Sequence, residues 1–276
     1  RLARGSGVDG LAGMASRRQA DGLTWLRPLL GLRRDDLRGW LMAQGVGWVE
    51  DPSNADPRFQ RVRARAALDA LVPVGIAAGG LADTADRMAM ARAALEHLAA
   101  TLSLQAVRLR AGAVEIDAVI LRDAPEETRL RLVSAALRWI GACDYRPRLE
   151  SLRDALGRAG EGRWRSLSGV LLAEKGGRLW LCREPGRVEA PVPAGAIWDR
   201  RWRICGADEG VTIGALDEPG LAQCPGWRDL GLPRAALLSS PAIWRDGMLI
   251  AAPCVVPDAA YRARIVAEFP YPTLPH

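Results

Sequence analysis

The sequence has little of several residue types on which enzymes and secreted proteins depend. It holds one lysine, Lys175, and two histidines, His97 and His276, so metal or triad chemistry that needs histidine is nearly excluded. The five cysteines are scattered, odd in number and never spaced C-x-x-C, which argues against a disulfide framework and a compact zinc site. Apolar runs such as 247–257 fall short of the ~20 residues that span a bilayer. With no signal-peptide pattern, a reducing, cytoplasmic compartment fits best.

The charge that is present is almost all arginine. The formal net charge is +6 and the pI is near 9.5, values that favour polyanionic partners. Guanidinium groups hold phosphates bidentately and stack on bases, so the excess suits a nucleic-acid ligand. A GC-rich genome, which replaces lysine with arginine, explains the same excess equally well.

Composition divides the chain into three regions, 1–75, 76–160 and 161–276, with a small mixed, β-rich region last. Apolar spacing and helix-start signals predict helices over 33–45, 57–71, 81–111, 125–141 and 149–156. Short apolar runs between glycine and proline turns predict strands at 46–49, 113–116, 165–172, 178–183, 198–204 and 243–251. The last four predict small antiparallel sheets.

Ten tryptophans against three tyrosines and two phenylalanines is an unusual balance. Seven lie in apolar patterns and are expected in the core: Trp139, Trp164, Trp180, Trp198, Trp202, Trp227 and Trp244. Trp25, beside Arg27, and Trp48, beside an acidic turn, are candidates for stacking on a nucleotide, although core packing is the favoured interpretation there too.

The densest polar segment runs from residue 50 to residue 65. A turn fixed by Pro52 carries three side chains with hydrogen-bonding atoms, namely Asp51, Ser53 and Asn54. Four arginines follow on the next helix: Arg58, Arg61, Arg63 and Arg65. Because Arg61 and Arg65 are four residues apart, they lie on one face and can hold neighbouring phosphates. Spacing alone favours a helix cap followed by a solvated basic face.

The glycine-rich opening is a second candidate for anion binding. Backbone N–H groups around Gly5, Ser6 and Gly7 can approach an anionic ligand closely. The segment lacks the GxGxxG spacing and the lysine of a Walker loop, so a helix C-terminus followed by a loop is the stronger interpretation of it alone.

Taken together, these segments resemble the tRNA(Ile)-lysidine synthetases, in order and in spacing. The match is specific over residues 1–71 and looser beyond, where it resembles alphaproteobacterial members. Its motifs are Arg4-Gly5-Ser6-Gly7, Gly10-Leu11-Ala12-Gly13-Met14, Arg27-Pro28-Leu29-Leu30 and Trp48-Val49-Glu50-Asp51-Pro52-Ser53-Asn54, followed by Phe59, Arg61, Arg63 and Arg65.

The resemblance implies a ligase that acts on tRNA(Ile) with a CAU anticodon. ATP adenylates the C2 carbonyl oxygen of the wobble cytidine, and the ε-amine of L-lysine then displaces AMP to give lysidine. It implies ATP and Mg²⁺ as cofactors, no membrane partner, and an α/β fold in which residues 1–75 end a doubly wound parallel nucleotide-binding domain. A helical tRNA-contacting domain would follow at 76–160, then the small mixed domain. The resemblance does not decide whether the protein forms a homodimer.

The same resemblance assigns expected roles to individual residues. Gly5, Ser6 and Gly7 would line the active-site cleft, while Asp51, Ser53 and Asn54 would build its wall. Arg61 and Arg65 would reach phosphate or tRNA, and Arg58, Arg63, Arg146 and Arg148 would contact tRNA. The family's main phosphate loop, SGGxDS, does not occur in this sequence, so we expect the chain alone to be inactive.

Two other functions remain open at this point. One is a different tRNA modifier of the same ATP-pyrophosphatase type, such as a wobble thiolase, although those often use paired cysteines. The other is a non-catalytic tRNA-binding module.

Overall fold

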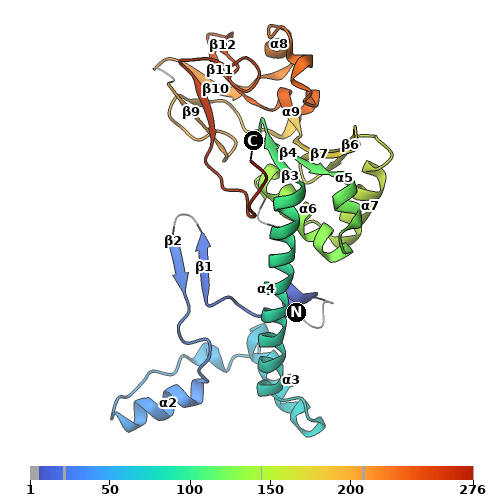
Figure 1. The fold of residues 1–276 in the computed structure, drawn as a ribbon. Coiled ribbons are helices and arrows are strands. Elements are labelled where there is room, and N and C mark those ends of the chain that lie inside the picture. The colour runs from blue at the N-terminus through green and yellow to red at the C-terminus, as the bar shows by residue number, and fades with distance from the viewer. Residues whose placement is uncertain (1–5, 21–22, 144, 207–208, 276) are drawn as a thin grey trace. The chain divides into compact units, whose positions relative to one another are not determined.

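A computed structural model describes residues 6–20, 23–143, 145–206 and 209–275. The chain separates into two compact units, residues 1–94 and 95–276, called here the N-terminal and C-terminal units; their boundary falls inside helix α4 (Ala78–Ala106). Besides the start of α4, the N-terminal unit contains α1 (Val8–Leu11), β1 (Arg17–Ala20), β2 (Leu23–Leu26), α2 (Arg34–Ala43), the 3₁₀ turn η2 (Pro52–Asn54), α3 (Gln60–Leu71) and η3 (Val72–Val74) (Figure 1).

Local signals set the helices of the N-terminal unit. The Asp36 carboxylate accepts a hydrogen bond from the Arg33 N–H at 3.1 Å, which caps α2, and the helix stops before Gly45 at φ +66°. The helix predicted over 33–45 is thus confirmed, and α3 confirms most of the one predicted over 57–71. The strand predicted at 46–49 is wrong, because this segment pairs with no strand in the described part of the chain.

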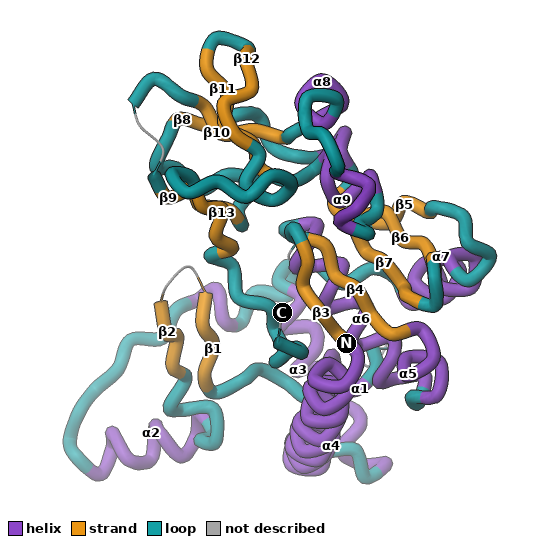
Figure 2. The backbone as a smooth tube through the Cα atoms, turned by 45° about the horizontal axis from the view of Figure 1, so that its top comes forward, coloured by secondary structure: helices purple, strands orange, loops and turns teal. Residues whose placement is uncertain are grey.

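The C-terminal unit is built on a five-stranded antiparallel sheet in the order β3-β4-β7-β6-β5 (Figure 2). Its strands are β3 (Val107–Arg110), β4 (Ala113–Asp117), β5 (Arg165–Leu167), β6 (Val170–Lys175) and β7 (Arg178–Arg183). The helix predicted over 81–111 therefore ends five residues early. The positive φ angles of Ala111 and Gly112 turn the chain back, so residues 107–110 gain hydrogen bonds from β4 that a helix would not give.

Alternation along the strands gives this sheet two covered faces. Ile116, Leu172 and Leu181 point to one face, where they form the main core with α6 (Glu126–Gly141) and α7 (Leu149–Ala159). Trp180 and Cys182 point to the other face and pack against the short helix α9 (Arg234–Leu238). Both α6 and α7 were predicted, since their apolar residues recur at helical spacing.

The rest of the C-terminal unit forms two small antiparallel sheets, as predicted for the runs 198–204 and 243–251, whereas the runs 165–172 and 178–183 belong to the five-stranded sheet. One has the order β12-β11-β10-β8 and the other pairs β13 with β9. Trp198 and Trp202 are buried in the core between them. The bounds are α5 (Ala118–Asp123), η4 (Pro185–Arg187), β8 (Val192–Pro193), β9 (Trp202–Cys205), β10 (Thr212–Ala215), α8 (Asp217–Leu221), η5 (Trp227–Leu230), β11 (Pro241–Arg245), β12 (Met248–Ala251) and β13 (Arg262–Ile265).

This arrangement differs from the division at residues 75 and 160. The five-stranded sheet takes strands from both sides of residue 160, because β4 and β7 pair along their length. The described strands pair antiparallel throughout, so the parallel sheet that the resemblance implies is not among them. No single helix among the described residues is long and apolar enough to cross a membrane. The segments α3–η3 and α4, which are bent by 101° at their junction, reach that length and apolar composition only when they are taken together.

Candidate functional site

The predicted turn at 51–54 is stabilised by the carboxylate of its first residue, Asp51. Asp51 Oδ1 accepts a hydrogen bond from the Ser53 N–H at 2.8 Å and so caps η2. This hydrogen bond is the largest cause of the lowered pKa of Asp51; the Ser53 hydroxyl and then the charge of Arg61 add to it. Asp51 is therefore an ionised, exposed carboxylate that orders the backbone up to Asn54, which is half-buried.

Arg61 reaches back from α3 over this turn. Its Nη2 donates to Ser53 Oγ at 3.3 Å, and its guanidinium carbon lies 4.9 Å from the centroid of the Phe59 ring. Asp51, Ser53 and Arg61 are thus brought together as predicted, and we call them the Asp51 cluster. The Arg61 cation stays exposed and the Ser53 side chain is half-buried, an arrangement that suits a phosphate or another anion.

The neighbouring arginines make other contacts. Arg58 pairs with Asp56 at 2.6 Å, and this hydrogen bond raises the pKa of Arg58. Arg63 donates to the backbone carbonyls of Pro57 and Arg58 at 2.9 and 3.0 Å, so it stabilises the start of α3. Arg65 is exposed on α3 and forms no hydrogen bond or ion pair with the described residues. Their roles in tRNA or phosphate binding stay predictions.

The glycine-rich opening is described only in part. Gly5 lies outside the described residues, while Ser6 and Gly7 precede α1, where the N–H groups of Gly10 and Leu11 donate to the Gly7 carbonyl. Among the described residues, no hydrogen bond joins Ser6 or Gly7 to the segment 50–65. Their place beside the Asp51 cluster therefore remains an expectation from the resemblance.

A second group beside the turn was not predicted. Glu50 accepts hydrogen bonds from Arg34 at 2.8 Å, from the Trp48 indole at 2.7 Å, and from Arg38. The Trp48 hydrogen bond is the largest cause of the lowered pKa of Glu50. We call these residues the Glu50 cluster; it fixes the chain directly before Asp51. The only sequence signal for it was the spacing of Arg34 and Arg38, four residues apart on one helix face.

Trp25 and Trp48 also depart from expectation. Their exposed fractions are 55% and 39%, so neither is packed in a core of the described residues. Trp48 instead orients Glu50, whereas Trp25 lies on the exposed β1–β2 hairpin. Exposure leaves both rings accessible to a ligand.

The two predicted tRNA-contacting arginines outside this segment belong to the C-terminal unit. Arg148 is the exposed N-cap residue of α7, and Arg146 lines a cleft of about 450 Å³ together with Glu96, Arg138 and Trp139. The described residues contain no group of three potential metal ligands.

Comparison with known proteins connects both units to one group of enzymes. Residues 1–71 match the family model of the PP-loop domain, and this segment contains both clusters. The chain is 43% identical to the tRNA(Ile)-lysidine synthase of Ruegeria pomeroyi over 255 residues, which are 92% of this chain and 61% of that protein. It is 32% identical to the tRNA(Ile)-lysidine synthase of Anaplasma marginale, over 74% of this chain and 46% of the relative.

A third relative carries the same name and matches a similar share of this chain. The tRNA(Ile)-lysidine synthase of Methylobacterium nodulans is 39% identical over 68% of this chain and 58% of its own length. The chain thus spans about half to three fifths of the relatives that it matches. The resemblance inferred from the sequence motifs is confirmed: nearly all of this chain is similar to tRNA(Ile)-lysidine synthases, and its first 71 residues are a match to the PP-loop domain.

Proposed function

We propose that this chain carries part of the active site and the following region of a ligase that joins L-lysine to C2 of the wobble cytidine of tRNA(Ile). In the first step, the C2 oxygen attacks ATP and pyrophosphate leaves. In the second, the lysine ε-amine forms the C–N bond as the C–O bond to AMP breaks. The observation that carries the proposal is the Asp51 cluster inside the PP-loop match.

Within this reaction, the Asp51 cluster is suited to hold an anion. The Asp51–Ser53 turn and the Phe59 ring fix Arg61, so its remaining N–H donors can meet a phosphate oxygen without a large ordering cost. ATP would place phosphates there, and arginine donors stabilise charge that develops as pyrophosphate leaves. The described residues offer donors for anions but no three-ligand metal group, so we assign Mg²⁺ to no residue of this chain.

The first experiment measures incorporation of radiolabelled lysine into a tRNA(Ile) transcript with a CAU anticodon. The enzyme is the Ruegeria pomeroyi relative in which the matched segment is replaced by this chain. We expect incorporation that Arg61→Ala lowers about 100-fold, the loss typical of removing a preorganised cationic or N–H donor. Arg87→Ala, on the exposed surface of α4 and outside both clusters, is the matched control and should leave incorporation unchanged.

A chimera that unfolds cooperatively, binds tRNA and incorporates no lysine would contradict the proposal. Equal incorporation by the Arg61→Ala and Arg87→Ala variants would remove Arg61 from the active site. For the chain by itself, we expect no AMP formation, because the SGGxDS loop does not occur in its sequence.

The alternative of a thiolase-type modifier has less support. Burial raises the pKa of the Cys182 thiol strongly and that of Cys254 to about 12, so neither is a thiolate near neutral pH. Among the described residues no two cysteines are disulfide-bonded. The alternative of a non-catalytic tRNA-binding module predicts salt-dependent tRNA binding by the chimera without lysine incorporation.

A further inference from the structure

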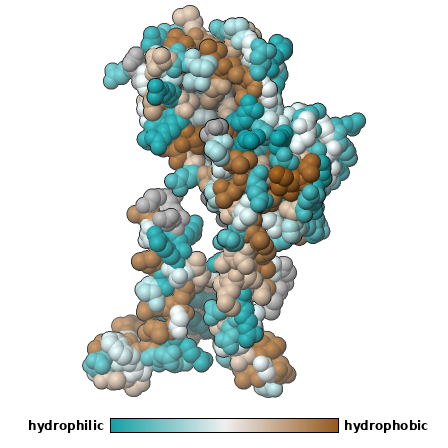
Figure 3. Space-filling view, viewed as in Figure 1, coloured by the Kyte–Doolittle hydropathy of each residue, from teal (hydrophilic) through white to brown (hydrophobic). Residues whose placement is uncertain are grey.

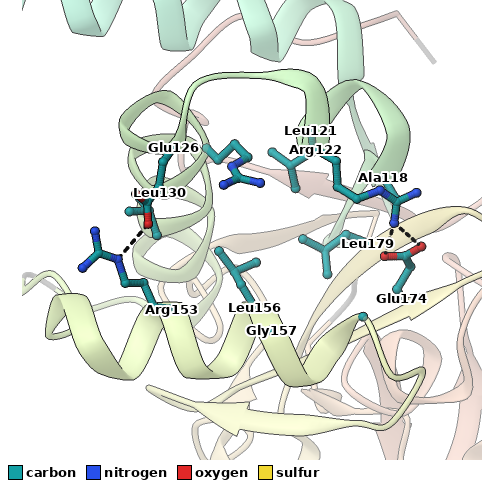
Figure 4. Close-up of a pocket in the computed structure, with 12 residues that line it drawn as sticks. Ala118, Leu121, Arg122, Glu126, Leu130, Arg153, Leu156, Gly157, Glu174 and Leu179 are labelled. Carbon is teal, nitrogen blue, oxygen red and sulfur yellow. Dashed lines mark hydrogen bonds and ion pairs between the residues drawn. The ribbon is translucent and has the colours of Figure 1, made fainter.

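The C-terminal unit contains a ligand-sized cavity that neither cluster nor the proposed reaction uses. It has a volume of about 490 Å³ and lies among α5, α6, α7 and the strands β6 and β7 (Figure 4). Close-packed interiors rarely keep voids larger than a water molecule, whereas small-molecule sites span about 300–1,000 Å³. The cavity therefore has the size of a binding site.

The inner surface of this cavity is aliphatic. Leu121, Leu130 and Leu179 are buried, and with Leu156 they point into the cavity in Figure 4. No aromatic side chain is among the residues that line it, so a stacked nucleobase finds no ring partner here. An aliphatic or single-ring body fits this surface better.

Charged side chains line the opening of the cavity. Arg153 pairs with Glu126 at 2.7 Å on one side, and Arg122 pairs with Glu174 at 2.9 Å on the opposite side (Figure 4). Each pair has one arginine and one glutamate, so the two pairs together contribute no net charge.

Arg129 is the third arginine that lines the cavity, and it changes this balance. It is half-buried, and no described residue forms a hydrogen bond or ion pair with it. After Arg153, its charge also contributes to the lowered pKa of Glu126, so its field reaches the cavity. The cavity therefore combines an aliphatic surface with one positive charge left to be neutralised.

We propose that this cavity binds a small organic monoanion with an apolar body, namely a carboxylic acid whose aliphatic chain or single ring contacts the four leucines. The carboxylate would meet the Arg129 guanidinium, which presents two parallel N–H donors to such a group. This inference does not rest on the proposed function, since it involves none of the residues assigned to the reaction.

The test is a titration of the chain with labelled leucine methyl groups, followed by NMR. The probes are hexanoate and its neutral match, hexanamide. We expect hexanoate to shift the methyl signals of Leu121, Leu130, Leu156 and Leu179 with a Kd of about 1 mM, in the range for ligands of about eight heavy atoms. Hexanamide should bind about tenfold more weakly, because it lacks the charge.

Two substitutions make the test specific. Arg129→Gln should lower hexanoate affinity about tenfold and leave hexanamide affinity unchanged, whereas Arg158→Gln, on α7 and paired with Asp154 outside the cavity, should change neither. Leu156→Phe, which adds volume inside the cavity, should abolish binding of both probes. Melting temperatures show that each variant is folded.

The proposal is overturned if hexanoate and hexanamide bind equally, or if hexanoate shifts none of the four leucines at concentrations well above 1 mM. Undiminished hexanoate binding by a folded Arg129→Gln variant would overturn it as well. A lysine-incorporation assay is independent of these readouts, so failure here leaves the proposed function untouched.

Discussion

The two units treat their apolar side chains very differently. In the N-terminal unit, Ala12 is the one described residue that is buried, while Trp40 and Val49 are 62% and 95% exposed. Figure 3 shows this apolar surface, in brown, over α2. The C-terminal unit instead encloses continuous cores around its sheets. Helical periodicity is similar in α2 and α6, so the pattern forms a helix in both, but only packing against a second element turns that pattern into a core.

The same contrast between exposure and burial appears in two charged clusters of similar composition, one in each unit. In each unit, one carboxylate sits between two arginines: Glu50 with Arg34 and Arg38, and Asp199 with Arg183 and Arg201. The Glu50 side chain is 50% exposed, whereas that of Asp199 is 1% exposed. Burial lowers the pKa of Arg201 to about 10, and the charge of Asp199 opposes that fall. Solvent screens the first group, but the second must be satisfied internally.

The largest effect should come from removing the buried carboxylate charge. Asp199→Asn leaves two buried guanidiniums facing a neutral amide, and we expect it to lower the free energy of unfolding of the C-terminal unit by about 3–5 kcal/mol. Hydrogen exchange of the β4 and β7 amides measures this change. Glu50→Gln is the matched substitution, and it should alter protection of α2 only slightly, because exposed ion pairs contribute little. Equal effects of the two substitutions would show that burial does not separate the clusters.

A smaller difference is expected at two glycines with similar backbones. Gly45 and Gly112 have φ angles of +66° and +77°, so alanine is strained at both by about 1–2 kcal/mol. A Cβ at Gly112 would also lie 2.4 Å from Cζ2 of Trp202, whereas one at Gly45 would meet nothing within 4 Å. We therefore expect Gly112→Ala to cost about 1–3 kcal/mol more than Gly45→Ala, each measured by hydrogen exchange in its own unit. No excess would mean that the Trp202 ring moves aside without loss.

These contrasts also explain what the sequence could reveal of the fold. Helices α2, α6 and α7 were predictable because caps and apolar spacing are local signals. The strand at residues 107–110 was not predictable, because it exists only through pairing with β4. The strand expected at 46–49 does not form, because no described strand pairs with it. Non-local pairing likewise put residues 107–117 and 165–183 in one sheet across the expected boundary at 160.

The candidate site divides in the same way. The Asp51–Ser53 turn is an interaction between residues two apart, so residue type and Pro52 sufficed to predict it. Arg61 was identified by helical spacing from Arg65, but its contact with Ser53 depends on how α3 follows the turn. The Glu50 cluster joins residues sixteen apart, and nothing local in the sequence indicates which acid Arg34 meets.

The smallest predicted effect concerns pKa values and compares Glu50 with Asp117 of the C-terminal unit. Both pKa values are lowered. The pKa of Glu50 is lowered first by the Trp48 hydrogen bond and then by the charges of Arg38 and Arg34, whereas that of Asp117 is lowered first by the hydrogen bond from the backbone N–H of Ile120. A lowered folded-state pKa means that each ionised group stabilises the fold above its unfolded pKa, 4.5 or 3.8, and that this contribution is lost as pH falls through the folded value. Salt screens exposed charges more than backbone hydrogen bonds. Raising the ionic strength should therefore raise the pKa of Glu50 more than that of Asp117, as followed by carboxyl ¹³C NMR. The Arg38→Gln substitution should reduce this salt response of Glu50. An equal response at both carboxyls would show that the arginine charges do not act on Glu50.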